Sequence, residues 1–386
     1  MPPSLLRFGI ASALAAAAAF TTIPTSAQSV DAALVARARA IHDRVLALDT
    51  HDDIDPVNFT STTNYTQRLD TQVNLPKMTE GGLDASFFIV YVGQPNPAQA
   101  PDALTPAGYD RAYKAAIEKF DAIHRLTEQI APRQIGLALT AADVRRIHGE
   151  GRKVALIGVE NGYPIGTDIR RVKEFYDRGG RYMSLAHNGN NQLSDSNTGE
   201  RDGYLWNNGI SPLGREVLAE MNRVGIMVDV SHPSKGSMMQ AAALSRAPII
   251  ASHSAIRALC DVSRNMDDEM LRALARTNGV VQIVGFSNYI KTQPQGSPRA
   301  TVADFVNHID YAVKLIGVDH VGISSDFDGG GGLADWKDAS ETFNVTLELV
   351  RRGYSEADIA RMWSGNLLRV MDDVQRVARE IQNGPR

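Results

Sequence analysis

The chain has 386 residues and a formal net charge of −4, a length that suits one large α/β barrel or two to three smaller domains. Hydrophobic residues make up 43% and charged residues 22%, which excludes a disordered chain, and no basic field is present to hold nucleic acid or an anionic membrane surface. The single cysteine, Cys260, excludes internal disulfides and multi-cysteine zinc or iron–sulfur sites.

The first 27 residues have the pattern of a secretory signal peptide. Arg7 is their only charged side chain, residues 8–20 form an uncharged Ala-rich run, and the small residues Thr25 and Ala27 precede Gln28. This pattern predicts cleavage near Ala27 and export, in a bacterial-type cell to the periplasm, with no stable membrane insertion afterwards. An uncleaved anchor or a plain Ala-rich helix is the alternative. Residues 28–386 are then expected to form a single domain.

Eight apolar runs alternate with helical patterns along the rest of the chain. Most runs are solid rather than alternating, which predicts strands buried on both faces, as in a parallel sheet. Eight strands separated by helices favour a (β/α)8 TIM-type barrel over an open doubly wound sheet, and no GxGxxG opens a first βα unit. The predicted strands are 45–48, 85–92, 154–159, 182–185, 225–230, 249–251, 280–284 and 320–323. The main predicted helices are 108–127, 168–178, 214–224, 234–244, 267–277 and 301–315, and N-caps are expected at Thr140 and Ser211.

Polar side chains lie at or directly after the C-terminal ends of these runs. In a barrel this end carries the active site, because the βα loops converge there. Four of the nine histidines lie at this rim, and the other five are expected to be structural or surface residues. The rim residues are His51, Asp53, Glu160, His187, Asp229, His232, His253, Asp326 and Asp328.

Five of the rim side chains form a candidate metal site. Neutral imidazole and carboxylate suit zinc and similar divalent ions. His51 and Asp53 project to the same side of an extended segment, and His232 and His253 arrive from two neighbouring strands. Three such donors satisfy one catalytic metal, whereas five can hold two metals if Glu160 bridges them. Paired metals can share and deprotonate one water and polarise a scissile carbonyl.

Seven motifs, in order along the chain, resemble those of one known family. They are DTHDD at 49–53, GVENG at 158–162, SLAHNGNN at 184–191, DVSH at 229–232, SHSAIR at 252–257, SRN at 263–265 and DFDG at 326–329. This set is similar to the membrane dipeptidase, or renal dipeptidase, family of the amidohydrolase superfamily. The likeness runs from about residue 45 to SGN at 364–366 and implies a metal-dependent barrel that hydrolyses dipeptides.

The resemblance also implies how the metals are held. His51 and Asp53 would bind one zinc ion, His232 and His253 would bind the other, and Glu160 would bridge the two. The cofactor implied is therefore two Zn²⁺ per chain.

For the substrate, the resemblance implies that His187 binds it and stabilises the tetrahedral intermediate. Arg264 would pair with its C-terminal carboxylate, although an arginine in the SRN loop can also bond backbone carbonyls. Asp326 would be the acid/base residue beside the metals, and Asp328 is the rival carboxylate. Asp229 is expected to orient a ligand histidine or a backbone turn.

The chain departs from the family pattern at three positions that are not ligands. The family often has Gly at the position of Thr50, Asn at that of Asp52 and Gly at that of Asn161. Asp52 and Asn161 border the expected pocket, so the departures concern substrate preference. Cys260 does not resemble the cysteine that cross-links subunits in animal members, and a homodimer without a disulfide is compatible with the sequence. The polar segment 192–208 is either a lid or a solvated loop.

The leading prediction is a secreted zinc dipeptidase. A water bridged by the metals would attack the carbonyl of a dipeptide that has a free C-terminal carboxylate, and Asp326 would carry the proton to the leaving amine. One alternative is another amidohydrolase-type activity on acyl amino acids or lactams. The other is a non-catalytic periplasmic protein that binds metal or peptide.

Overall fold

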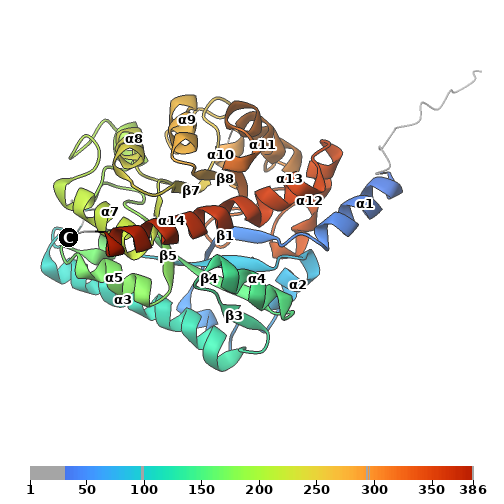
Figure 1. The fold of residues 1–386 in the computed structure, drawn as a ribbon, viewed down its shortest axis with the longest axis horizontal. Helices are drawn as coiled ribbons and strands as arrows, with labels where there is room; N and C mark the ends of the chain where they lie inside the picture. The colour runs from blue at the N-terminus through green and yellow to red at the C-terminus, as the bar shows by residue number, and fades with distance from the viewer. Residues whose placement is uncertain (1–30, 97–99, 293, 295, 385–386) are drawn as a thin grey trace, which may run out of the picture.

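The computed structural model describes residues 31–96, 100–292, 294 and 296–384. The predicted signal peptide, residues 1–27, lies outside this part of the chain. The described residues form one parallel sheet surrounded by helices (Figure 1). Its strands are β1 (Leu48–Asp53), β2 (Ala85–Tyr91), β3 (Ile135–Leu137), β4 (Lys153–Glu160), β5 (Gly180–Ser184), β6 (Met227–Asp229), β7 (Ile249–Ser254), β8 (Val280–Val284) and β9 (Val321–Ser324).

Eight of these strands form a nearly closed barrel. They are hydrogen-bonded in the order β1-β2-β4-β5-β6-β7-β8-β9, and β3 pairs with β4 outside this path. A parallel bridge between Asp52 and Phe327 joins the two ends of the sheet, and the Asp53 N–H donates to the Phe327 carbonyl at 2.9 Å. The predicted (β/α)8 fold is confirmed, because parallel strands alternate with helices around this ring.

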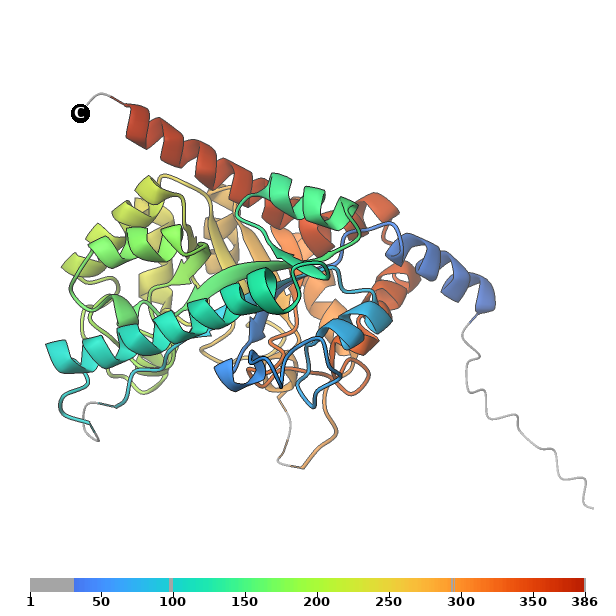
Figure 2. The same ribbon diagram turned by 90° about the horizontal axis from the view of Figure 1, so that it is seen from below.

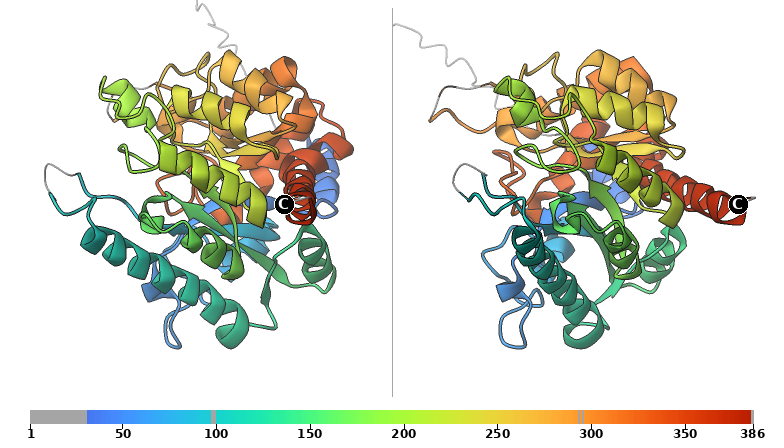
Figure 3. Two further views of the ribbon diagram at one scale, coloured as in Figure 1. Left: turned by 60° about the vertical axis from the view of Figure 1, so that its left-hand side comes forward. Right: turned by 90° about the vertical axis from the view of Figure 1, so that its left-hand side faces the viewer.

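Helices cover the outside of the barrel in every view (Figure 1 and Figure 3). Two predicted N-caps are confirmed: Thr140 Oγ1 accepts from the Asp143 N–H at 3.0 Å, and Ser211 Oγ accepts from the Gly214 N–H at 2.9 Å. The helices are α1 (Ala32–His42), α2 (Leu75–Gly81), α3 (Pro106–Arg125), α4 (Ala141–Gly149), α5 (Arg170–Asp177), α6 (Asn197–Arg201), α7 (Pro212–Val224), α8 (Lys235–Leu244), α9 (Asp268–Arg276), α10 (Ser287–Ile290), α11 (Val302–Ile316), α12 (Phe343–Arg351), α13 (Glu356–Ala360) and α14 (Asn366–Asn383). None of them combines the length and the apolar character that a membrane span requires, among the residues that the structure describes.

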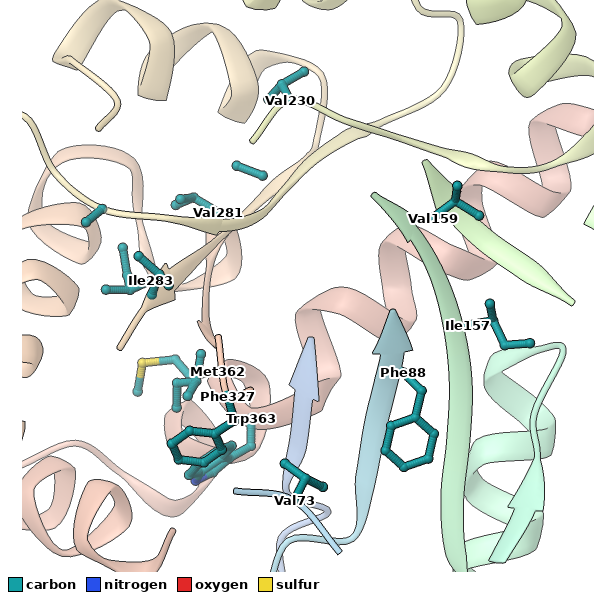
Figure 4. Close-up of a cluster of buried hydrophobic side chains, with 14 of the residues drawn as sticks. Val73, Phe88, Ile157, Val159, Val230, Val281, Ile283, Phe327, Met362 and Trp363 are labelled. Carbon is teal, nitrogen blue, oxygen red and sulfur yellow. The ribbon is translucent and has the colours of Figure 1, made fainter. Parts of the chain in front are cut away.

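The larger hydrophobic core lies between the strands and the outer helices. Strand residues such as Phe88 and Ile157 pack there with helix residues such as Phe120 and Phe305. Figure 4 shows Phe88 and Ile157 on neighbouring strands of this cluster, and it shows Phe327, Met362 and Trp363 gathered beside the end of the barrel sheet. Burial of both strand faces explains why the runs in the sequence are solid rather than alternating.

A second core closes the N-terminal end of the barrel. Leu48 and Val280, at the starts of their strands, lie in one cluster with Leu367, Met371 and Val374 of α14. Figure 2 shows α14 along one end of the molecule and the loop that follows β1 at the other end. The end that carries the predicted site residues is therefore left open to substrate.

Most strands differ from the predicted bounds by one to three residues at an end, and β1 and β3 differ for reasons that the structure explains. β1 begins at Leu48 rather than at residue 45, and it continues through polar residues to Asp53. Parallel neighbours bury both faces of this segment, so its polar end remains a strand although it is not apolar. The apolar pattern does not predict β3, because three residues paired on one side leave too short a signal.

Candidate metal centre and substrate cavity

The strands bring the five expected metal donors to one end of the barrel. His51 and Asp53 lie in β1, Glu160 is the last residue of β4, and His253 lies in β7. His232 follows β6 by three residues. All are buried except Asp53, whose side chain is 15% exposed.

Glu160 lies between two groups of donors. Its Oε2 is 3.6 Å from His51 Nε2, which is itself 3.7 Å from Asp53 Oδ2. Its Oε1 is 3.0 Å from His232 Nε2 and 3.3 Å from His253 Nε2. The ligand atoms of each group lie within 4.8 Å of one another. These are the two sets expected from the sequence, and each carboxylate oxygen faces one of them.

The buried polar atoms of this cluster fit a bound cation. His51 Nε2 and Glu160 Oε1 are buried without a hydrogen-bond partner among the described residues. The Nε2 atoms of His232 and His253 face each other at 3.0 Å. Buried polar groups without partners are costly, and cations would satisfy these nitrogen and oxygen lone pairs.

The hydrogen bonds of His51 leave its Nε2 free for a metal. The Tyr182 hydroxyl donates to the Thr50 carbonyl at 3.0 Å, so toward His51 Nδ1, at 2.9 Å, it accepts. His51 therefore carries its proton on Nδ1, and the lone pair of Nε2 points toward Glu160.

The other two histidines are held in the same way. Ser252 Oγ donates to Asp229 Oδ2 at 2.6 Å, so it accepts from His253 Nδ1 at 2.8 Å. His232 Nδ1 donates to Asn188 Oδ1 at 3.2 Å. Asp229 thus orients His253, a candidate ligand, through Ser252, and all three rings present Nε2 to the cluster.

His187 lies beside the cluster and faces the cavity. Its Nε2 is 3.8 Å from Glu160 Oε1, and its Nδ1 is 3.3 Å from the Tyr91 hydroxyl. Burial lowers the pKa of His187, and Glu160 partly opposes that shift. A neutral imidazole at this position can hydrogen-bond a substrate oxygen or accept a proton.

Asp326 lies close enough to the donors to take part in their chemistry. Its Oδ1 is 4.0 Å from His51 Nε2, and it forms a third possible donor group with His51 and His253. Burial raises the pKa of Asp326 to about 8 in the chain without cations, and bound cations would lower it. Its backbone φ of 61° is in the left-handed region, as is that of His232 at 75°. Such conformations are uncommon for residues other than glycine and concentrate at functional sites.

Asp328 has a different environment. Its carboxylate accepts from the backbone N–H groups of Gln72 at 2.8 Å and Val73 at 3.2 Å. These bonds fix the loop that precedes α2. The structure therefore gives Asp328 a structural contact that Asp326 does not have.

Arg264 is buried and is engaged by the protein itself. Its Nη2 donates to the His253 carbonyl at 2.7 Å, and its Nη1 donates to Ser254 Oγ at 2.9 Å. Its Nε is buried without a partner among the described residues, and the guanidinium lies 5.5 Å from the centre of the Tyr289 ring. The backbone contact foreseen as an alternative is thus present, and Arg264 does not itself line the cavity.

A cavity of about 580 Å³ opens above the donors. This volume is in the range of small-ligand pockets. None of residues 192–208 lines it; that segment is instead ordered by Asp195, whose carboxylate accepts from the N–H groups of Trp206 and Gly209, both at 2.8 Å. The wall includes six of the eight predicted site residues, namely Asp53, Glu160, His187, His232, His253 and Asp326.

Several residues of the site do not follow from sequence reasoning. Tyr182 lies in an apolar strand and is expected to be core, while Tyr91 and Lys119 lie in a strand and a helix with no motif around them. Asn188 is within SLAHNGNN, so the motif marks this residue, but its hydrogen bond to His232 does not follow from the sequence.

Known proteins resemble this chain over most of its length. The sequence profile of the membrane dipeptidase family, peptidase family M19, matches residues 35–385. Dipeptidase aclJ of Aspergillus oryzae is 35% identical over 313 residues, which cover 80% of this chain and 72% of that protein. Dipeptidase verJ of Clonostachys rogersoniana is 34% identical over 312 residues, which cover 80% of this chain and 77% of that protein.

Solved structures agree with these sequence matches. The probable dipeptidase PvdM from Pseudomonas aeruginosa has a TM-score of 0.82 at 32% identity, covering 90% of this chain and 99% of that one. A metallopeptidase from Rhodobacter sphaeroides, solved with a phosphinate mimic of the dipeptide L-Ala-D-Ala, has a TM-score of 0.73 at 25% identity, covering 86% of this chain and 99% of that one. Since the profile spans the barrel and the relatives exceed 30% identity, the chain belongs to the membrane dipeptidase family, peptidase family M19, and is a metal-dependent dipeptidase.

Proposed function

We propose that the protein is a two-zinc dipeptidase that requires a free C-terminal carboxylate on its substrate. The observation that carries the proposal is the position of Glu160, whose two oxygens face two separate donor groups. His51 and Asp53 would hold one ion, His232 and His253 the other, and Glu160 both. Bound zinc would polarise the scissile carbonyl and make a water acidic enough to attack near neutral pH.

The remaining side chains supply binding and proton transfer. Asp326, which is not needed for the five-donor set, takes the proton of the attacking water and delivers it to the leaving nitrogen. His187 faces the cavity and hydrogen-bonds the oxygen of the tetrahedral carbon. We assign the terminal carboxylate to Arg264, whose Nε has no partner among the described residues, although its side chain is not part of the cavity wall.

Metal analysis and substrate length test the proposal together. Purified active protein should contain about two equivalents of zinc, and a chelator should abolish hydrolysis of L-Ala-L-Ala. The dipeptide amide and the tripeptide should be cleaved far more slowly than the dipeptide. One equivalent of metal in fully active protein would refute bridging by Glu160. Equal rates on the dipeptide and its amide would show that Arg264 is structural.

We also propose that the protein is exported. Support comes from the basic start, the Ala-rich run and the small residues before Gln28 in the sequence. N-terminal sequencing of protein recovered from the periplasmic fraction should begin near Gln28. Recovery of the intact N-terminus from the cytoplasm would contradict export.

A further inference from the structure

One basic side chain in the wall of the substrate cavity has no ionic partner within the described part of the chain. Lys119 of α3 is the only lysine or arginine in the cavity wall among the described residues. Its Nζ donates to the Ile54 carbonyl at 2.8 Å and lies 5.9 Å from the centre of the Tyr91 ring. Lys114, five residues earlier on the same helix, pairs with Asp110 at 2.8 Å, whereas no carboxylate of the described residues lies within 4.0 Å of Lys119 Nζ.

The contacts of Lys119 leave N–H donors of its charged group available to a ligand. An ammonium group has three N–H donors, and the Ile54 carbonyl takes one of them. Burial lowers the pKa of Lys119, and Asp53, Asp55 and Glu160 oppose that shift. A substrate carboxylate placed beside Lys119 would favour its charged form in the same way.

Lys119 and Arg264 lie on opposite sides of the barrel mouth. Lys119 contacts the residue after β1 and the end of β2, whereas Arg264 is bonded to His253 and Ser254 of β7. In the ring of strands, β2 is four steps from β7 in either direction. A dipeptide whose terminal carboxylate points toward Arg264 therefore directs its N-terminal residue toward Lys119.

We propose that Lys119 binds a carboxylate on the side chain of the substrate's N-terminal residue, so that the enzyme prefers dipeptides that begin with glutamate or aspartate. This inference rests on the proposed dipeptidase function and on the orientation set by Arg264. The α-amino group of such a substrate is repelled by Lys119 but can approach Asp55, a carboxylate in the same wall. The substrate class is thus an acidic residue followed by a residue with a free carboxylate.

Matched substrates test the inference in the zinc-loaded enzyme. L-Glu-L-Ala and L-Gln-L-Ala have the same shape and differ in side-chain charge. We expect kcat/KM for the glutamate substrate to exceed that for the glutamine substrate by about tenfold to a hundredfold, the worth of a charge-assisted hydrogen bond. In Lys119→Met the ratio should fall to near one, and in Lys119→Arg it should remain. Because the ratio is internal to each preparation, it does not depend on how much of a variant is active.

Lys114→Met is the control, since it removes a lysine from the same helix outside the cavity, and it should leave the ratio unchanged. A wild-type ratio near one, or a high ratio retained in Lys119→Met, overturns the inference. Cleavage of L-Ala-L-Ala distinguishes failure of the Lys119 role from failure of the proposed function. If the enzyme cleaves L-Ala-L-Ala but does not prefer L-Glu-L-Ala over L-Gln-L-Ala, only the role of Lys119 fails. If zinc-loaded protein cleaves none of these dipeptides, the proposed function fails with it.

Discussion

Tyr182 of β5 fixes the orientation of His51, a candidate metal donor in β1, through one hydrogen bond. Replacing it with Phe leaves His51 Nδ1 and the Thr50 carbonyl without their buried partner. Loss of such an outer hydrogen bond typically weakens metal binding ~10–100-fold, so Tyr182→Phe should show that loss in a chelator competition assay. Tyr354→Phe, which removes a hydroxyl bonded to Asp310 at 2.7 Å away from the site, should bind zinc normally. Equal zinc affinity in the two variants would show that Tyr182 does not orient His51.

Substitution of Asp326 distinguishes a role in proton transfer from a role in metal binding. Asp326→Asn keeps the size of the side chain but cannot accept a proton, so kcat should fall by ~10²–10⁴ with near-normal metal content. Asp328→Asn is the comparison, because its carboxylate is bonded to backbone N–H groups, and kcat should change far less. If Asp326→Asn instead loses metal in proportion to activity, Asp326 is a ligand, as its distance of 4.0 Å from His51 Nε2 also permits.

At the scale of single residues, the chemical role open to a side chain follows from the sequence more readily than its contacts do. His51, Asp53 and Glu160 could be identified because residue type and position at a strand end suffice to suggest a donor. The hydrogen bond from His51 to Tyr182 could not, because it depends on which way two rings turn inside the barrel. For Arg264 the sequence left two roles open, and the structure shows one of them, the backbone contact, already in place.

At the scale of elements, α11 is joined to the barrel rim by a histidine that must be neutral. His308 Nδ1 accepts from the Ile256 N–H at 3.1 Å, and its Nε2–H donates to the Ile290 carbonyl at 2.8 Å. Burial lowers the pKa of His308 to about 4, against about 6.5 in an unfolded chain. Between these values only the unfolded chain binds the proton. Stability contributed by this group is therefore complete above about pH 6.5 and declines by ~3 kcal/mol as the pH falls to about 4.

His308→Gln should reduce this acid sensitivity. The melting temperatures of wild type and variant, both treated with a chelator so that metal loss is not measured, would be compared from pH 7 to pH 4.5. The melting temperature of the variant should be lower than that of wild type at pH 7 and should fall less steeply as the pH is lowered. Some decline should remain, because burial also lowers the pKa of His42. Parallel curves for the two proteins would show that His308 does not titrate as described.

The elements also show where apolar patterns stop being informative. β8 was predicted with its observed bounds, because its five residues are buried on both faces. The apolar run at 45–48 begins three residues before β1 and ends five residues before the end of β1, because the polar second half of β1 is buried by the site rather than by the core. α14 has a regular apolar stripe and covers one end of the barrel, but it is not among the helices predicted from the sequence.

For the whole molecule, the proposed metal centre links distant parts of the chain. Its five candidate donors come from β1, β4, the turn after β6 and β7, so an unfolded chain cannot present them together. Ions that bind only the folded chain stabilise it, by ~2.7 kcal/mol per site at a free concentration 100 times Kd. Chelation should therefore lower the melting temperature by several degrees, and added zinc should restore it in a concentration-dependent way. A melting temperature unmoved by proven metal removal would contradict this linkage.

The position of α14 also bears on the order in which the protein can be completed. α14 packs on Leu48 and Val280 at the starts of β1 and β8, and it is synthesised after all the strands, so a nascent chain has its strands before the helix that covers them. Until residues 367–377 leave the ribosome, the apolar starts of the strands face water or other chains. A chain that stops at Gly365 would keep all five candidate metal donors and yet be prone to aggregate, so termination at that residue should yield insoluble protein rather than a weaker enzyme.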